Sequence, residues 1–197
     1  METISIHKPK VVVIGSCNTD MVVKANRLPV PGETILGGTF YMNPGGKGAN
    51  QAIAASRLGA EVTFISKIGY DLFGLQALEI YKSEKINTDF IFTDQKSPSG
   101  VALISVDSFG ENSIIVAPGA SRSLSIEDIN KAEEKIKEAD IILMQLEIPI
   151  ETVEYAATIA KKYNKKVILN PAPASTLSNS FLNNVHTILP NRIEAEM

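Results

Sequence analysis

The 197-residue chain has 19 Lys and Arg residues against 22 Asp and Glu residues, a net charge of −3, and 44% hydrophobic residues. This composition is ordinary for a globular domain, and the scattered basic residues exclude a clustered basic surface for nucleic acid or anionic lipid. No run approaches the roughly 18 uninterrupted apolar residues of a membrane span, and the polar start from Met1 to Lys10 does not resemble a signal peptide. The single cysteine, Cys17, excludes an internal disulfide. We therefore expect a cytoplasmic protein with no nucleic-acid or membrane partner.

Short apolar runs alternate with helical patterns along most of the chain. Helix 49–58 ends before Gly59, which suits the C′ position, and Ser125 with Asp128 forms a capping-box pattern. This alternation predicts a doubly wound, mainly parallel α/β sheet with right-handed crossovers. The expected strands are 11–14, 62–65, 141–144, 167–169 and 187–189, and the expected helices are 49–58, 72–85, 126–136 and 150–163.

Two segments without a crossover helix interrupt this alternation. Residues 21–23 and 34–41 are β-like, and two β-rich runs within 100–118 flank a turn at 108–112. They predict a small antiparallel β lid made of residues 21–44 and 97–118. The α/β body then comprises residues 1–20, 45–96 and 119–197. Residues 192–197 resemble the first turns of a helix with no C-cap, so we expect this body to be incomplete, with its C-terminal part missing.

A glycine-rich loop, Gly45-Gly46-Lys47-Gly48-Ala49-Asn50, precedes the first helix. Its spacing is wrong for a P-loop, because no glycine stands five positions before Gly46 and Lys47 is followed by Gly48. A glycine-rich turn that only enters the helix is one interpretation. The other is a ligand-binding loop, in which Lys47 and Asn50 supply donors suited to hydroxyl groups.

Two further polar clusters follow strands of the predicted sheet. Asn18-Thr19-Asp20 comes after the first strand, and Gln145-Leu146-Glu147 comes after strand 141–144. Taken singly, each is also explained as a polar turn or a solvated loop charge. Because the carboxyl ends of parallel strands meet at one edge of an open sheet, the clusters together with the glycine loop predict a polyol site.

With these motifs the chain resembles the ribokinase-like carbohydrate kinase family, which also includes adenosine kinase and fructokinase. The resemblance runs nearly end to end, and the Gly-Gly-Lys-Gly-Ala-Asn loop followed by Gln51 is its most specific part. The matching segments are Gly15-Ser16 with Asn18-Thr19-Asp20, Pro31 to Thr34, Gly45 to Gln51, Arg57 to Ala60, Gly69 with Asp71 and Gly74, Gln145 to Glu147, Asn170 to Pro173, and Pro190-Asn191 with Glu194.

The resemblance implies ATP-dependent phosphorylation of D-ribose to D-ribose 5-phosphate, with Mg²⁺ accompanying ATP and a monovalent cation such as K⁺ in full-length relatives. It places Asn191 beside the nucleotide, gives Glu194 an indirect role in magnesium placement, and implies a homodimer formed through the lid. The implied sugar-binding residues are Asn18, Thr19, Asp20, Gly46, Lys47, Gly48, Ala49, Asn50 and Glu147.

The family also carries a Gly-Ala-Gly-Asp segment whose aspartate is the catalytic base, and this chain has no glycine after Gly119. We therefore expect no catalytic residue in the chain and negligible ribose phosphorylation by it alone. Three alternatives stay open: a kinase for another furanose or a nucleoside, an inactive sugar-binding or dimerising remnant, and a chain that does not fold stably. Cys17 is expected to be a small buried side chain, and neither His7 nor His186 is expected to bind metal.

Overall fold

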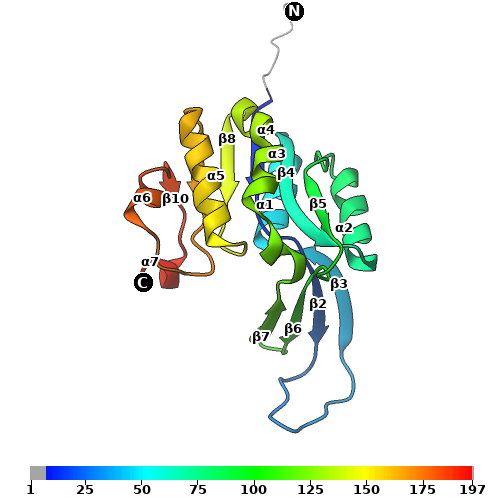
Figure 1. The fold of residues 1–197 in the computed structure, drawn as a ribbon. Coiled ribbons are helices and arrows are strands. Elements are labelled where there is room, and N and C mark those ends of the chain that lie inside the picture. The colour runs from blue at the N-terminus through cyan, green and yellow to red at the C-terminus, as the bar shows by residue number, and fades with distance from the viewer. Residues whose placement is uncertain (1–7, 197) are drawn as a thin grey trace, which may run out of the picture.

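A wholly parallel six-stranded sheet forms the centre of the α/β body in the computed structural model, which describes residues 8–196 (Figure 1). The strand order is β10-β9-β8-β1-β4-β5, so β1 lies in the middle of the sheet. The strands are β1 (Lys10–Ile14), β4 (Glu61–Gly69), β5 (Ile91–Asp94), β8 (Ile141–Met144), β9 (Lys166–Leu169) and β10 (Thr187–Ile188).

Helices cover both faces of this sheet, as predicted for a doubly wound fold. Successive residues of β1 enter different cores: Val12 and Ile14 pack into one apolar cluster, and Val11 and Val13 into the other. The helices are α1 (Lys47–Arg57), α2 (Leu72–Ser83), α3 (Ile126–Lys131), α4 (Glu133–Glu138), α5 (Ile150–Lys162), α6 (Asn179–Leu182) and α7 (Arg192–Ala195), with a 3-10 turn, η1 (Gly119–Ser123). None of the helices within residues 8–196 is long and apolar enough to cross a membrane.

A second, four-stranded sheet projects from the carboxyl edge of the body (Figure 1). It contains β2 (Asn18–Lys24), β3 (Thr39–Gly45), β6 (Gly100–Val106) and β7 (Asn112–Ala117) in the order β3-β2-β6-β7. We call this sheet the lid. The prediction of a purely antiparallel lid was wrong, because its central pair, β2 and β6, is parallel. Both strands leave the same edge of the parallel body sheet, β2 after β1 and β6 after β5, so they run outward side by side.

The structure moves several predicted boundaries. Residues 34–38 are not in a strand, because Gly37 and Gly38 adopt positive φ, and the strand expected there is β3. The helix expected over 126–136 is divided at Ala132 into α3 and α4. Strand β5 was not predicted, since its sequence Ile-Phe-Thr-Asp contains only two consecutive apolar residues. The capping box of Ser125 and Asp128 is confirmed.

Candidate functional site

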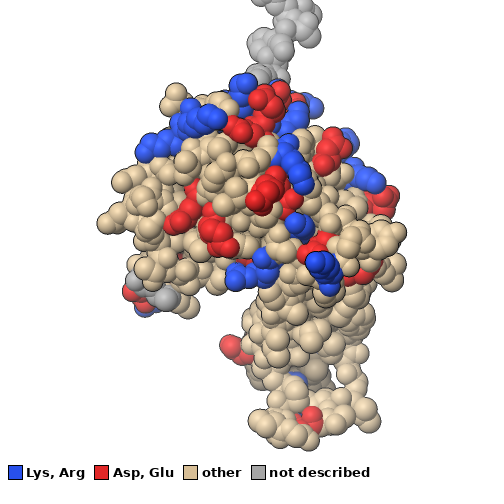
Figure 2. Space-filling model, viewed as in Figure 1, with Lys and Arg blue, Asp and Glu red and all other residues tan. Residues whose placement is uncertain are grey.

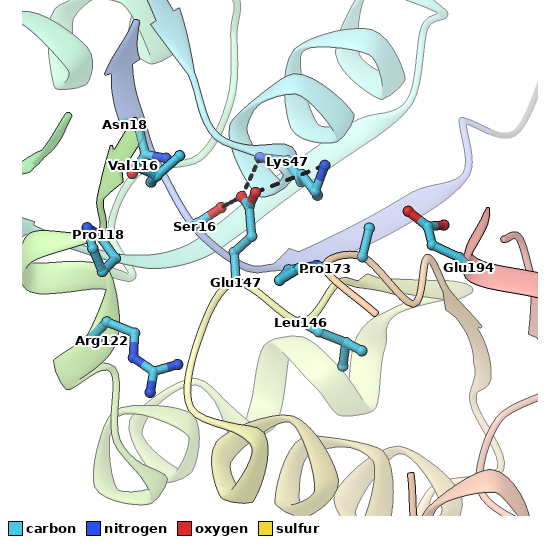
Figure 3. A pocket seen from close by; sticks show the side chains of 11 residues that line it. Ser16, Asn18, Lys47, Val116, Pro118, Arg122, Leu146, Glu147, Pro173 and Glu194 are labelled. Carbon is cyan, nitrogen blue, oxygen red and sulfur yellow. Dashed lines mark hydrogen bonds and ion pairs between the residues drawn. The ribbon is translucent and has the colours of Figure 1, made fainter. Parts of the chain in front are cut away.

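A cavity of about 400 Å³ lies where the lid joins the body, beyond the carboxyl ends of β1 and β8 (Figure 3). Since β1 and β8 are neighbouring parallel strands, the loops that follow them open at the same edge. The residues that line the cavity are Ser16, Asn18, Lys47, Val116, Pro118, Arg122, Leu146, Glu147, Ala172, Pro173 and Glu194.

Glu147 connects the loop after β8 with the glycine loop. Its Oε2 accepts a hydrogen bond from the backbone nitrogen of Lys47 at 2.9 Å and another from Ser16 Oγ. The Lys47 ammonium lies 3.9 Å from Oε1 of the same carboxylate, in an ion pair that remains partly exposed. Three separate segments therefore meet at one carboxylate at the edge of the cavity (Figure 3).

Asn18 and Asp20 project from the same face of β2, two residues apart. Asn18 is buried, and its Oδ1 has no hydrogen-bond partner among the described residues. Burial, and secondarily the charge of Glu147, raises the pKa of the Asp20 carboxyl above its ordinary value. Asn18 thus offers an unused polar atom, and Asp20 a carboxylate whose ionised form is disfavoured unless it gains donors.

Backbone crowding explains the glycines of the loop. A Cβ on Gly45 would lie 2.0 Å from Asp20 Oδ1, and one on Gly48 would lie 2.7 Å from the Ser16 carbonyl oxygen. Gly46 adopts φ +89°, a conformation that favours glycine, immediately before α1 begins at Lys47. The loop is therefore packed directly against Asp20 and Ser16, and its glycines allow that approach.

The structure separates some predicted sugar-binding residues from this cavity. Thr19 points to the opposite face of β2 and lines a smaller cavity with Asn43 and Phe73. Gly48 and Ala49 are buried in the contact between α1 and the body, where the Ala49 nitrogen donates to the Ser16 carbonyl, and Asn50 is exposed. Among the predicted residues, Asn18, Lys47, Glu147 and Glu194 line the large cavity itself.

Asn191 and Glu194 form a capping box at the start of α7. The Asn191 side chain accepts from the Glu194 nitrogen, and the Glu194 carboxylate accepts from the Asn191 nitrogen, both at 2.8 Å. Asn191 Nδ2 also donates to Glu194 Oε1 at 2.8 Å. Glu194 therefore faces the cavity with both carboxylate oxygens already hydrogen-bonded (Figure 3).

Sequence reasoning missed two polar residues of the cavity, Ser16 and Arg122. Ser16 stands two positions before Asn18, in the loop that follows the first strand, and this position could have identified it. Arg122 lies on η1, which no periodic pattern marks, and its guanidinium has no ion-pair partner within residues 8–196. Gln145, by contrast, is fully buried and donates to Gln51 Oε1, so it supports α1 from within the body.

The chain is similar to known carbohydrate kinases in sequence and in fold. The model of the pfkB family of carbohydrate kinases matches residues 8–197. The chain belongs to this family. A ribokinase of Haemophilus influenzae is 46% identical over 94% of the chain and 60% of its own length, and a deoxyribokinase of Salmonella typhi is 39% identical over 95% and 61%. The pfkB fold of this chain also matches a structure of Arabidopsis thaliana ribokinase complexed with ribose and ATP, with a TM-score of 0.82 and 33% identity, over 95% of this chain and 62% of that one.

This pfkB chain therefore spans about 60% of the length of these relatives. The family resemblance seen in the motifs is confirmed, as are the α/β fold and the small second sheet, apart from the direction of one strand pair. The buried state predicted for Cys17 is also confirmed, and burial raises the pKa of its thiol to about 11. His7 lies outside the described residues.

Proposed function

We propose that this chain forms the sugar-binding part of a ribokinase, an enzyme that transfers phosphate from ATP to D-ribose. The observation that carries the proposal is the convergence of Asn18, Lys47 and Glu147 on one cavity between the body and the lid. A family relative with a ribokinase name and 46% identity supports the choice of activity.

The polar groups of this site complement a polyol. Asp20 and Glu147 accept hydrogen bonds from ribose hydroxyls, while Lys47 and Asn18 donate to their oxygens. From the side of the loop, Lys47 is the residue that lines the cavity. Gly48 and Ala49 support the site only by packing α1 against the body, and Thr19 supports it only as part of β2. Closure of the lid over the sugar keeps water from competing as the phosphoryl acceptor.

On the ATP-binding side of the site, the residues that we propose to act are Asn191 and Glu194. Mg²⁺ supplies charge neutralisation for the phosphates of ATP, and Glu194 fits an indirect role because its oxygens are occupied by the capping box. Within residues 8–196, no group of three His, Cys, Asp or Glu side chains is arranged to hold a metal ion. We assign no catalytic base to this chain, and K⁺ dependence stays a prediction for the longer protein.

We also propose that two copies associate through their lids in the cytoplasm. The lid face opposite the cavity carries the exposed apolar side chains Val23, Phe40, Met42, Leu103 and Ile115. Figure 2 shows few charged side chains on the part of the lid in view, in contrast to the body. Leu103→Glu combined with Ile115→Glu is expected to convert a dimer to a monomer in sedimentation velocity. A wild-type chain that sediments as a monomer at high concentration would contradict this proposal.

A second candidate substrate is another furanose such as 2-deoxyribose, favoured by the deoxyribokinase relative at 39% identity. Titration calorimetry with ribose, 2-deoxyribose, fructose and adenosine distinguishes these sugars. A coupled ADP assay with the same sugars, on a chain extended through a Gly-Ala-Gly-Asp segment, tests the kinase activity. Turnover by the 197-residue chain itself would contradict the expectation that it lacks the catalytic groups.

The variants Asn18→Ala and Thr19→Ala provide a matched pair for this titration, because they are neighbours on opposite faces of β2. We expect Asn18→Ala to weaken ribose binding by about tenfold or more and Thr19→Ala to leave it nearly unchanged. Tighter binding of adenosine or fructose than of ribose would overturn the ribokinase proposal.

A further inference from the structure

Asp71 holds the segment between β5 and β6, through which the chain enters the lid for the second time. It is the N-cap residue of α2, and its Oδ1 accepts from the Gly74 nitrogen at 2.9 Å. The same carboxylate reaches across to Ser99, just before β6: Oδ1 accepts from Ser99 Oγ and Oδ2 from the Ser99 nitrogen, each at 2.7 Å. One carboxylate therefore joins the start of α2 to the start of the lid.

Ser99 is held tightly from its other sides as well. It is 7% exposed, and its Oγ accepts a hydrogen bond from the Gly69 nitrogen at 3.0 Å. A Cβ on Gly69 would lie 2.4 Å from the Ser99 nitrogen, and one on Gly74 would lie 2.8 Å from Ser99 Oγ. Ser99 therefore occupies a space that is free because Gly69 and Gly74, which lie against it, have no side chains. Asp71 supplies the acceptors for the Ser99 nitrogen and hydroxyl in this space.

The next residue, Gly100, lies directly beneath the side chain of Asn18. The two residues are partners in the parallel β2–β6 pair, and a Cβ on Gly100 would lie 2.1 Å from Asn18 Oδ1. The position of the Gly100 backbone therefore limits where the Asn18 amide can lie. A shift of Ser99 moves Gly100, and Gly100 moves the amide that faces the cavity.

We propose that Asp71 is a positioning residue for the sugar site, acting through Ser99 and Gly100 on Asn18. The inference rests on the proposed sugar-binding function of the cavity. Asp71 does not touch the cavity and contributes no contact to a sugar. Burial opposes ionisation of Asp71, but the hydrogen bonds that its carboxylate accepts from Gly74 and Ser99 outweigh this effect and lower its pKa.

The competing explanation is that Asp71 only caps α2. The variant Asp71→Asn separates the two roles, because asparagine caps a helix about as well as aspartate. An asparagine at this position has one acceptor oxygen and an NH₂ group that faces a donor of Ser99. In this variant the remaining oxygen keeps the cap to the Gly74 nitrogen and the bond from Ser99 Oγ. The bond from the Ser99 nitrogen is lost, because the NH₂ group that replaces Oδ2 faces that nitrogen as a second donor.

The first experiment is a double-mutant cycle on ribose binding, measured by calorimetry with the full chain. We expect Asp71→Asn to weaken ribose affinity about tenfold in the wild-type background and to have almost no further effect in the Asn18→Ala background. An equal loss in both backgrounds would show that Asp71 does not act through Asn18. An unchanged affinity in the wild-type background would also overturn the proposal.

The second experiment does not depend on ribose. Cys17, the residue before Asn18, is 3% exposed and is the only cysteine of the chain, so its labelling rate with a thiol reagent reports local opening at the lid junction. We expect Asp71→Asn to raise this rate severalfold over wild type and over the exposed control Asp89→Asn, at denaturant-free conditions where global unfolding contributes little. Equal labelling rates would overturn the role of Asp71, whereas absent ribose binding by the wild-type chain, with faster Cys17 labelling, would reject only the proposed sugar function.

Discussion

The carboxylate of Glu147 accepts a hydrogen bond at 2.9 Å from the backbone nitrogen of Lys47, 100 positions earlier in the chain. This contact closes one side of the cavity by joining the loop after β8 to the first residue of α1. It also satisfies a backbone donor at the start of a helix, which has no partner within the helix itself. The same carboxylate therefore supports the fold and faces the proposed substrate.

Replacement of Glu147 by Gln tests this double role. The variant keeps one acceptor oxygen but loses the charge that strengthens the bonds from Lys47 and Ser16. We expect the free energy of unfolding to fall by about 1 to 2 kcal/mol in urea titrations and ribose affinity to fall with it. The control is Glu151→Gln, the same change on an exposed residue of α5. Similar effects of the two substitutions would contradict the assignment.

Gly45→Ala tests the close contact between the glycine loop and Asp20. The added Cβ would lie 2.0 Å from Asp20 Oδ1, so the carboxylate must move out of its position in the site. We expect overpacking to lower the free energy of unfolding by roughly 1 to 3 kcal/mol and to weaken ribose binding at least tenfold. The same substitution in an Asp20→Ala background is expected to be much less destabilising, since the clashing atoms are gone. Equal destabilisation in both backgrounds would show that a clash with the Asp20 side chain is not the cause.

The raised pKa of Asp20 leads to two predictions, one for the stability of the variant Asp20→Asn and one for the pH dependence of ribose binding by the wild type. Burial, and then Glu147, favours the protonated carboxyl in the folded chain, so ionisation opposes folding as the pH rises above the ordinary pKa of 3.8, and this penalty is complete above the raised folded pKa. We expect the variant to unfold at a higher urea concentration than wild type at pH 7, and the difference to disappear below the ordinary pKa of 3.8. As the pH is lowered, the ribose affinity of the wild type is expected to begin falling at a higher pH than it would if Asp20 had the ordinary pKa of an aspartate. A variant less stable than wild type at pH 7 would contradict this view.

The ion pair of Lys67 and Asp128 provides a stability prediction away from the cavity. Lys67 Nζ lies 2.7 Å from Asp128 Oδ2, and the Asp128 side chain is 6% exposed. Lys67→Met leaves that carboxylate without its close partner and is expected to destabilise the chain by roughly 3 kcal/mol. The control is Lys131→Met, because Lys131 lies 3.7 Å from the same carboxylate but is 64% exposed, and we expect less than about 1 kcal/mol there.

The pH dependence of this pair has a defined sign. Burial raises the pKa of Asp128, but hydrogen bonds from Lys67 and Ser125 outweigh it and the net shift is downward. The stabilisation is therefore present above the unfolded pKa of the carboxyl and is lost as the pH falls through the lower folded value. We expect the difference between wild type and Lys67→Met to shrink in acid. A difference that grows as the pH falls would reject the ion pair as its cause.

The class of fold could be predicted from the sequence, and so could the meeting of several polar residues at one edge of the sheet. Apolar runs such as Val11–Ile14 are long enough and regular enough to mark buried parallel strands, and Gly59 and Ser125 mark helix ends through local backbone chemistry. The polar residues after those strands could be predicted to meet, because parallel strands end at one edge. Local patterns of this kind depend only on neighbours in the chain.

Which of those residues face the cavity, and how the strands of the lid pair, depends on contacts between distant segments of the chain. Thr19 lies between Asn18 and Asp20 in sequence, yet the pleat of β2 turns it to the other face. The parallel pairing of β2 with β6, the entry of Arg122 into the cavity and the contact between Asp71 and Ser99 join segments that no local pattern relates. Each depends on where distant strands leave the body sheet, and that is fixed only when the whole domain packs.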